Sequence, residues 1–236
     1  MNIALTYFCN QRCVYCFGMD AMASSRNPEA KEMTLDNLNR VMRFMKKSGV
    51  SRFNMIGGEP TLHSKFEEVF DAISDNGFPI MIFSNGVIDK KRVDFLTGKD
   101  NLNTILLNIR QPTEYSPNEW GKIIYTLSSL KNKVTLSFRI YRMDFDPNFL
   151  FDLIDKYKLE RLINWAIACP SLISNNVYIK LEDHERAVAR MVKFSRVSKR
   201  RKIGWYTDSG FILCAFANGK LEALRISMPI TLPFSS

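Results

Sequence analysis

The stretch that decides the fold is Asn2-Ile-Ala-Leu-Thr-Tyr7, followed at once by Phe8-Cys9-Asn-Gln-Arg-Cys13-Val-Tyr-Cys16. Its first part is a short run rich in β-forming residues, which predicts a strand. Its second part brings three thiols into eight residues. Because sites in α/β proteins are built where parallel strands end, the stretch predicts a thiol site at the edge of an α/β sheet.

The rest of the chain alternates between strand-like and helix-like segments. Further strands are predicted at 52–56, 80–83, 104–109, 134–141 and 162–168, and helices at 34–47, 63–76, 90–96, 118–130, 148–157 and 182–198. From the second strand on, strand starts lie about 24–30 residues apart, the spacing of βαβ units. Six such units are too few for a complete eight-stranded barrel, so we expect an α/β fold that is a partial (β/α)6 TIM-like barrel.

The regular alternation stops after Pro170. We therefore expect two parts, a partial barrel over 1–170 and a C-terminal helix with a short extension over 171–236. A short run, 203–206, follows the helix in the second part.

Composition restricts the class of protein. With 46% hydrophobic and 24% charged residues, the chain has the balance of a globular protein and not of a disordered one. No apolar run approaches the length of about 20 residues that crosses a bilayer, and the start lacks the charged region of a targeting signal. We expect a cytoplasmic protein without membrane contact.

The three clustered cysteines favour metal or redox chemistry over a disulfide framework. A zinc site needs a fourth protein ligand, and neither His63 nor His184, the two histidines, is spaced to supply it. An iron–sulfur cluster can be held by three cysteines. On spacing alone, cysteines without a role or a zinc site completed by a distant cysteine stay open.

Gly57-Gly58-Glu59-Pro60 directly follows the second predicted strand, at the same sheet edge as the cysteines. A C-x3-C-x2-C motif after strand one and a G-G-E-P motif after strand two together resemble the radical S-adenosylmethionine (SAM) superfamily. The resemblance covers about residues 1–170. It implies an anaerobic enzyme that uses a [4Fe-4S] cluster and SAM, with the cluster held by Cys9, Cys13 and Cys16.

The resemblance also implies how SAM is bound. Glu59 would accept a hydrogen bond from the SAM ammonium group, and the backbone of Gly57 and Gly58 would line its methionine end. The backbone around Tyr15 would meet the adenine. Reductive cleavage of SAM would then give a 5′-deoxyadenosyl radical that abstracts a substrate hydrogen.

Three further SAM contacts follow from strand ends. Ser84 ends strand three, Asn108 ends strand four and could reach the ribose, and Arg139 on strand five would suit the SAM carboxylate. Strand alternation places Arg139 on the same face as Ser137 and Tyr141. A turn at Asn85-Gly86 and a simple ion pair of Arg139 are the alternatives.

The C-terminal part resembles the region after the barrel in peptide-modifying radical SAM enzymes of the SPASM and twitch group. Of the further cysteines that such an extension would use, only Cys214 is present, so we expect no second cluster. Cys169 could be a buried small hydrophobe. The apolar tail is expected to pack on the barrel or to join a homodimer.

We expect a peptide or protein substrate and, by family analogy, a flavodoxin-like or ferredoxin-like electron donor. RNA or a small metabolite is the alternative substrate, and a truncated, non-catalytic cluster-binding fragment is the alternative function. The net charge of +9 is concentrated between Lys180 and Lys202, where nine basic and three acidic residues lie. This surplus predicts a basic helix face formed by Arg186, Arg190, Lys193, Arg196 and Arg200. The face is either solvated or a binding site for an acidic peptide, a phosphate group or RNA.

Overall fold

The computed structural model describes residues 1–19, 31–171 and 175–208. Seven parallel strands form one sheet in which spatial order follows sequence order. The strands are β1 (Asn2–Thr6), β2 (Phe53–Gly57), β3 (Ile80–Ser84), β4 (Leu102–Asn108), β5 (Val134–Ile140), β6 (Leu162–Ile167) and β7 (Gly204–Thr207). The helices are α2 (Leu35–Lys47), α3 (Phe66–Asp75), α4 (Lys90–Thr97), α5 (Pro117–Leu130), α6 (Asn148–Tyr157) and α7 (His184–Arg200).

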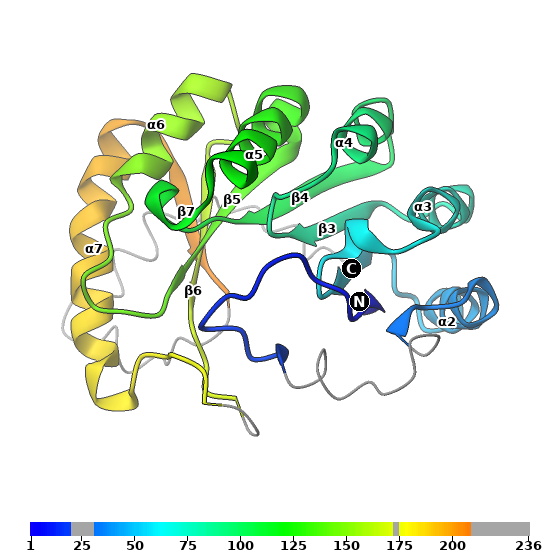
Figure 1. Cartoon of the computed structure of the whole chain (residues 1–236), viewed down its shortest axis with the longest axis horizontal. Coiled ribbons are helices and arrows are strands. Elements are labelled where there is room, and N and C mark those ends of the chain that lie inside the picture. The colour runs from blue at the N-terminus through cyan, green and yellow to red at the C-terminus, as the bar shows by residue number, and fades with distance from the viewer. Residues whose placement is uncertain (20–30, 172–174, 209–236) are drawn as a thin grey trace.

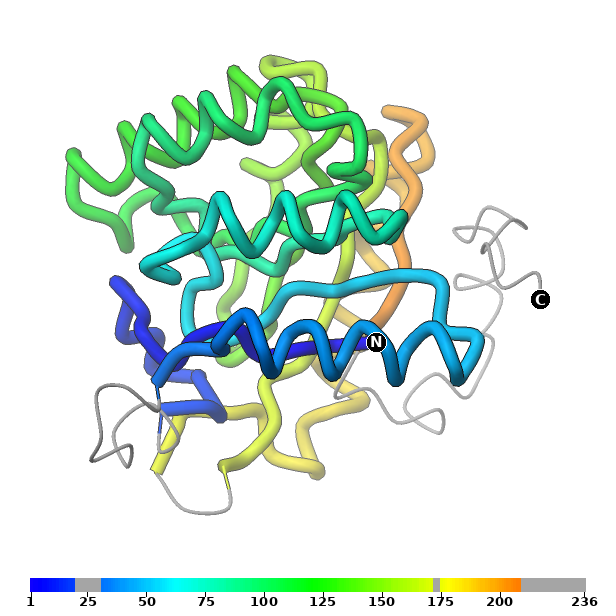
Figure 2. The backbone as a smooth tube through the Cα atoms, turned by 90° about the vertical axis from the view of Figure 1, so that its right-hand side faces the viewer, coloured from blue at the N-terminus to red at the C-terminus, as the bar shows by residue number. Residues whose placement is uncertain are grey.

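The helices lie in an arc outside the curved sheet (Figure 1). Figure 2 shows α2, α3 and α4 side by side along one flank of the molecule. This is the predicted partial TIM-like barrel, and the α/β fold class is confirmed.

The sheet has one strand more than the predicted six. The run at 203–206 forms β7, which pairs in parallel with β6 through Ile163 and Trp205. At four residues this strand is too short for its own alternation to mark it, so only the neighbouring strand reveals it. The boundary expected near residue 170 stays a prediction, with β7 beyond it in the same sheet.

Local signals explain where the helices begin. Thr34 Oγ1 accepts a hydrogen bond from Asn37 N at 3.3 Å, which caps α2. In α5, the Ser116 and Glu119 side chains cap each other's backbone N–H groups. Helix α3 begins at Phe66, later than predicted, because a 3-10 turn, η2 (Pro60–Leu62), comes first.

Strands β5 and β6 are buried on both faces, and the two faces differ in character. Phe138 on β5 packs against Phe149 of α6 and Trp165 of β6, on the helix side. The alternate residue Ser137 points into the barrel, where its hydroxyl donates to Asn164 Oδ1 at 2.8 Å. The predicted alternation on β5 therefore separates an apolar outer face from a partly polar interior.

All strands being parallel, their carboxyl ends meet at one edge of the sheet. After β1 the chain continues into the loop Phe8–Cys16, called here the cysteine loop. Residues 31–33 return alongside β1, with Tyr7 N donating to Lys31 O at 2.9 Å and Met33 N to Leu5 O at 2.7 Å. In the described part of the chain, no helix has the length and apolar character needed to cross a membrane.

Candidate functional site

The cysteine loop rests on the turn that follows β2. Gly58 N donates to Thr6 O at 2.8 Å, and Glu59 N donates to Phe8 O at 2.7 Å. A Cβ atom on Gly57 would lie 2.3 Å from Thr6 O, and one on Gly58 would lie 2.2 Å from Phe8 O. The two glycines therefore let the turn approach the backbone of the cysteine loop. Their predicted contact with SAM stays a prediction.

The three thiols of the loop share one environment. Burial raises the pKa of Cys9 to about 11, and the nearby Cys13 and Cys16 add to that increase. Burial also raises the pKa of Cys13, while the Arg110 guanidinium opposes the increase. None of these cysteines is in a disulfide, and each is partly exposed. The predicted ligands are thus free thiols within electrostatic reach of one another.

The donor set of this loop fits a [4Fe-4S] cluster. Over residues 1–19, 31–171 and 175–208, no group of three His, Cys, Asp or Glu side chains is placed to hold one metal ion. In a [4Fe-4S] cluster each thiolate binds a different iron, so the sulfurs lie farther apart than around one ion. Three thiols are the soft donor set that such a cluster requires.

Glu59 is fully buried, and protein donors occupy its carboxylate. Oε1 accepts from Thr61 Oγ1 at 2.7 Å and from Thr61 N at 3.3 Å. Ser84 Oγ lies 3.0 Å from both carboxylate oxygens, and Asn85 N donates to Oε2 at 2.8 Å. Burial raises the pKa of Glu59, and these hydrogen bonds oppose the increase. Glu59 therefore ties the ends of β2 and β3 together, and its predicted bond to the SAM ammonium stays a prediction.

Ser84, which was predicted to contact SAM, donates its hydroxyl hydrogen bond to Glu59 in the structure. Its neighbour Asn85, which the sequence offered only as part of a turn, instead meets the cysteine loop. Asn85 Nδ2 lies 3.7 Å from Cys9 Sγ. No spacing rule marks this residue, because the contact depends on how the end of β3 faces the loop.

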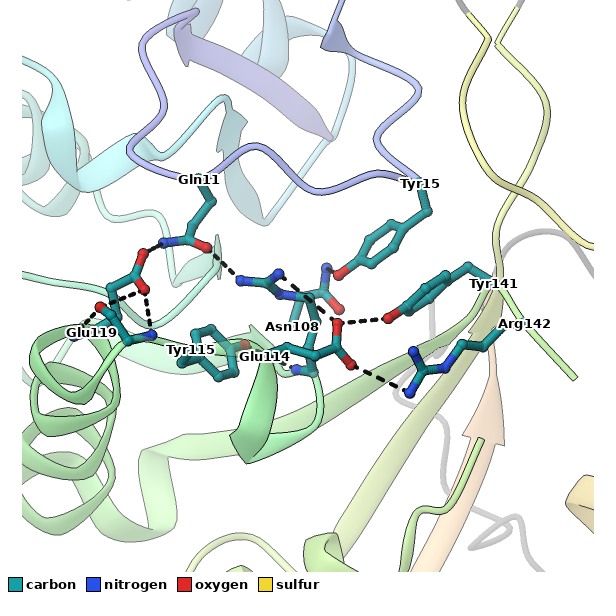
Figure 3. Close-up of polar contacts among 10 residues, drawn as sticks. Gln11, Tyr15, Asn108, Glu114, Tyr115, Glu119, Tyr141 and Arg142 are labelled. Atoms are coloured by element: carbon teal, nitrogen blue, oxygen red, sulfur yellow. Dashed lines mark hydrogen bonds and ion pairs between the residues drawn. The ribbon is translucent and has the colours of Figure 1, made fainter. Parts of the chain in front are cut away.

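Tyr15 and Asn108 lie together above the barrel interior (Figure 3). Asn108 Nδ2 donates to the Tyr15 hydroxyl at 3.3 Å, and the Tyr15 and Tyr141 ring centroids are 4.7 Å apart. Asn108 Oδ1 is buried and has no hydrogen-bond partner among the described residues. A buried acceptor without a donor is costly, and a ligand hydroxyl would relieve that cost. This fits the predicted ribose contact.

The sequence missed a charged network beside Asn108, drawn in Figure 3. Arg110 donates to Gln11 Oε1, and its guanidinium lies 4.0 Å from Glu114. The Tyr141 hydroxyl donates to Glu114 at 2.6 Å, and Arg142 is 3.9 Å from the same carboxylate. Burial raises the pKa of Tyr141 to about 12, and the hydrogen bond to Glu114 adds to the increase.

The network reaches the first turn of α5. Gln11 Nε2 donates to Glu119, the carboxylate of the α5 capping box. Gln11 thus links Arg110 to Glu119 from the middle of the cysteine loop. Two features of the sequence could have identified these residues as part of the site. Gln11 lies between Cys9 and Cys13, and Arg110 lies just after β4.

The role of Arg139, predicted to bind the SAM carboxylate, stays a prediction. Arg139 is partly buried and borders a small hollow with Gln111, Glu114 and Arg142. No hydrogen bond or ion pair joins the Arg139 side chain to another described residue. Arg110, not Arg139, is the arginine that contacts the cysteine loop.

The segment after β6 covers the other side of the cysteine loop. Val177 N donates to Val14 O at 2.8 Å, and Asn176 Nδ2 donates to Tyr15 O at 3.2 Å and to Cys169 O at 2.8 Å. The Tyr15 carbonyl, expected near adenine, thus already has a protein donor. Cys169 is partly exposed, not a fully buried hydrophobe as suggested.

A pocket of about 450 Å³ opens beside this segment, lined by Ala168, Cys169, Pro170 and residues 178–182 and 184.

Neither histidine contributes to a thiol site. His63 lies 2.9 Å from Met33 O and accepts from Lys65 N, and His184 lies 3.3 Å from Ile179 O.

The basic face of α7 is only partly free. Arg186 pairs with Asp183, and Arg190 donates to Phe145 O and stacks on the Phe145 ring. Lys193, Arg196 and Arg200 are exposed, in the half of the helix that leads to the amino edge of the sheet. Cys214 and the expectations for the apolar tail lie outside the described residues.

Comparisons with known proteins agree with this geometry. The family described as the Radical SAM superfamily matches residues 3–141. A protein named as a glycyl-radical enzyme activating enzyme in Methanocaldococcus jannaschii is 27% identical over 178 residues, 69% of this chain and 63% of that protein. A GTP 3′,8-cyclase of Clostridium perfringens is 28% identical over 167 residues, 66% of this chain and 50% of that protein.

Solved structures show the same fold. Streptococcus suis SuiB bound to S-adenosylmethionine has a TM-score of 0.71 at 16% identity, covering 91% of this chain and 51% of that one. SuiB bound to the precursor peptide SuiA has a TM-score of 0.67 at 17% identity, covering 91% and 49%. The chain spans less than two thirds of the length of each of these relatives. Since the family match covers more than half of the chain and includes the cysteine loop, the protein belongs to the radical SAM superfamily, whose enzymes use a [4Fe-4S] cluster and S-adenosylmethionine.

Proposed function

We propose that this radical SAM enzyme acts on a peptide or protein side chain. When bound, the cluster and SAM supply a one-electron cleavage that yields a 5′-deoxyadenosyl radical for hydrogen abstraction. The proposed cluster ligands are Cys9, Cys13 and Cys16, in the loop that contacts from several other parts of the chain hold in place. Tyr15 and Asn108 would then border SAM.

The observation that carries the peptide proposal is the character of the surface around the cysteine loop. Large apolar side chains are exposed there, on the loop and on the segment after β6, forming what we call the apolar rim: Tyr7, Phe8, Val14, Phe17, Val177, Tyr178 and Leu181. The hydrogen bond from Val177 N to Val14 O joins the two halves of this rim. An apolar surface next to a site suits a peptide with hydrophobic side chains.

The neutralised arginines of the network beside the loop favour a peptide over a nucleoside triphosphate such as GTP. Arg110 and Arg142 both lie near Glu114, which offsets their charge. On α7, Lys193, Arg196 and Arg200 lie toward the opposite edge of the sheet, and the exposed Arg186 is paired with Asp183. Relatives named for a protein substrate and a structure with a bound precursor peptide support the same reading. The GTP 3′,8-cyclases among the relatives make GTP the second candidate.

The test is hydrogen transfer under anaerobic conditions. The cofactor-loaded protein is incubated with SAM, a reductant and either a deuterated peptide rich in apolar side chains or deuterated GTP. We expect deuterium to appear in 5′-deoxyadenosine with the peptide. Deuterium from GTP alone would contradict the peptide proposal, and no 5′-deoxyadenosine in any arm would favour the non-catalytic alternative. A Cys13→Ala variant controls for SAM breakdown without the cluster.

A further inference from the structure

Asn85 follows β3 and lies against the first cysteine of the loop. Its Nδ2 atom is 3.7 Å from Cys9 Sγ and 2.9 Å from Asn10 Oδ1. Its Oδ1 atom accepts from Val87 N at 2.9 Å. Because a backbone N–H only donates, the amide oxygen must face Val87, which leaves the amide nitrogen facing the thiol.

The Asn85 side chain is held in this orientation from several sides. Its backbone N–H donates to the buried Glu59 carboxylate at 2.8 Å. Asn10 closes the arrangement from the cysteine loop, since Asn10 Nδ2 donates to Val87 O at 2.7 Å. Turning the Asn85 amide away from Cys9 would break its bonds to both Val87 and Asn10. Protein contacts alone therefore fix the position of this donor.

We propose that Asn85 raises the reduction potential of the cluster by donating a hydrogen bond to the Cys9 thiolate. Hydrogen bonds to cluster sulfurs are one of the factors that set such potentials. The donor stabilises the reduced cluster more than the oxidised one, because the reduced cluster carries one more negative charge. Asn85 acts through Cys9, so it is a positioning residue and not a catalytic one. The inference rests on the cluster and is independent of the substrate proposed above.

The experiment compares midpoint potentials of the reconstituted clusters of wild type and Asn85→Asp, without SAM or substrate. The change replaces the donor by an oxygen and adds a negative charge at the same place. At a fixed applied potential we expect the ratio of reduced to oxidised cluster to fall about tenfold, which is about 59 mV for a one-electron couple. Asn85→Ala removes only the donor, so its potential should shift in the same direction by less.

Asn101→Asp is the matched control. It makes the same chemical change at an exposed residue before β4, at the amino edge of the sheet, where Asn101 donates to Ser74. Its potential should equal that of wild type. An unchanged potential in Asn85→Asp with full cluster content would overturn the proposal, as would an equal shift in Asn101→Asp.

If Asn85→Asp loses its cluster, a measurement on the wild-type protein tests the hydrogen bond from Asn85 to Cys9 instead. With asparagine side chains labelled with ¹⁵N, pulsed electron paramagnetic resonance of the reduced cluster should show coupling to one side-chain nitrogen. Asn10 Nδ2 is directed at Val87 O, which leaves Asn85 as its source. The absence of coupling would overturn the proposal. Neither readout involves a substrate, so failure of the peptide test leaves this result standing, and the reverse also holds.

Discussion

The guanidinium group of Arg110, just after β4, donates a hydrogen bond to the side-chain oxygen of Gln11 in the middle of the cysteine loop. The Arg110 side chain is only 15% exposed, so this is a nearly buried charge held between the loop and Glu114. The contact fixes the loop from the interior side of the barrel, opposite the turn after β2.

Replacing Arg110 with Met should therefore destabilise the cofactor-free protein. A hydrogen bond from a charged group is worth about 1.5–3 kcal/mol, so we expect the free energy of unfolding to fall by about 2 kcal/mol. Urea denaturation measures the change. Arg142→Met is the control, because Arg142 lies near the same Glu114 but is 44% exposed, and its loss should cost less than about 1 kcal/mol. Equal losses in the two variants would show that the contact with Gln11 contributes nothing.

The glycine turn gives a second prediction. Gly58→Ala should lower the melting temperature sharply or prevent soluble expression, because its Cβ would lie 2.2 Å from Phe8 O, a backbone atom that cannot move alone. Gly121→Ala, in α5, has no atom within 4 Å of the new Cβ and should stabilise the protein by about 0.5–1 kcal/mol. A Gly58→Ala protein as stable as wild type would mean that the turn is not packed on the loop as described.

Glu59 predicts a pH dependence of stability. Since burial raises its pKa, the folded state holds the proton more tightly than the unfolded state does. The contribution of Glu59 to stability is therefore greatest below the ordinary carboxyl pKa and declines as pH rises from there toward the raised value. Glu59→Gln removes this titration. The free energy of unfolding of wild type minus that of Glu59→Gln, measured in urea at several pH values, should decrease with rising pH across that range. An increase would contradict the assignment.

The cluster ligands are tested by paired cysteine variants. Cys13→Ala should lose the iron, the sulfide and the visible absorbance near about 400 nm that accompany a cluster, while remaining folded. Cys169→Ala removes another partly exposed thiol at the same sheet edge and should keep about four iron and four sulfide per chain. Retention of iron in Cys13→Ala, or its loss in Cys169→Ala, would require a different ligand set.

The fold could be predicted from the sequence because its signals are local. Thr34 before α2, the Ser116–Glu119 pair before α5 and the spacing of apolar residues each act within a few residues of chain. Strand β7 escaped prediction because a four-residue segment has no pattern of its own and forms only against β6. The approximate ends of the helices could be predicted for the same local reasons.

The site could be predicted only where a motif carried it. Cys9 and Glu59 stand in recognisable spacings, so the sequence singled them out as candidates. It could not tell that protein donors would occupy Glu59, since Ser84 and Asn85 meet it only when β2 and β3 pair. Arg110 was missed for the same reason, because its partner Gln11 lies 99 residues away in the chain.

The contacts that hold the cysteine loop have a consequence for how the protein is made. The loop is synthesised before the residues that hold it: the Gln11 side chain binds Glu119, 108 residues later in the chain, and the Tyr15 carbonyl binds Asn176, 161 residues later. Contacts of such sequence separation form late, because long loops must close first. On the ribosome, the three thiols therefore emerge well before the scaffold that orders them. Cluster insertion is thus expected to follow synthesis of most of the barrel, and until then the thiols depend on the reducing conditions around the nascent chain.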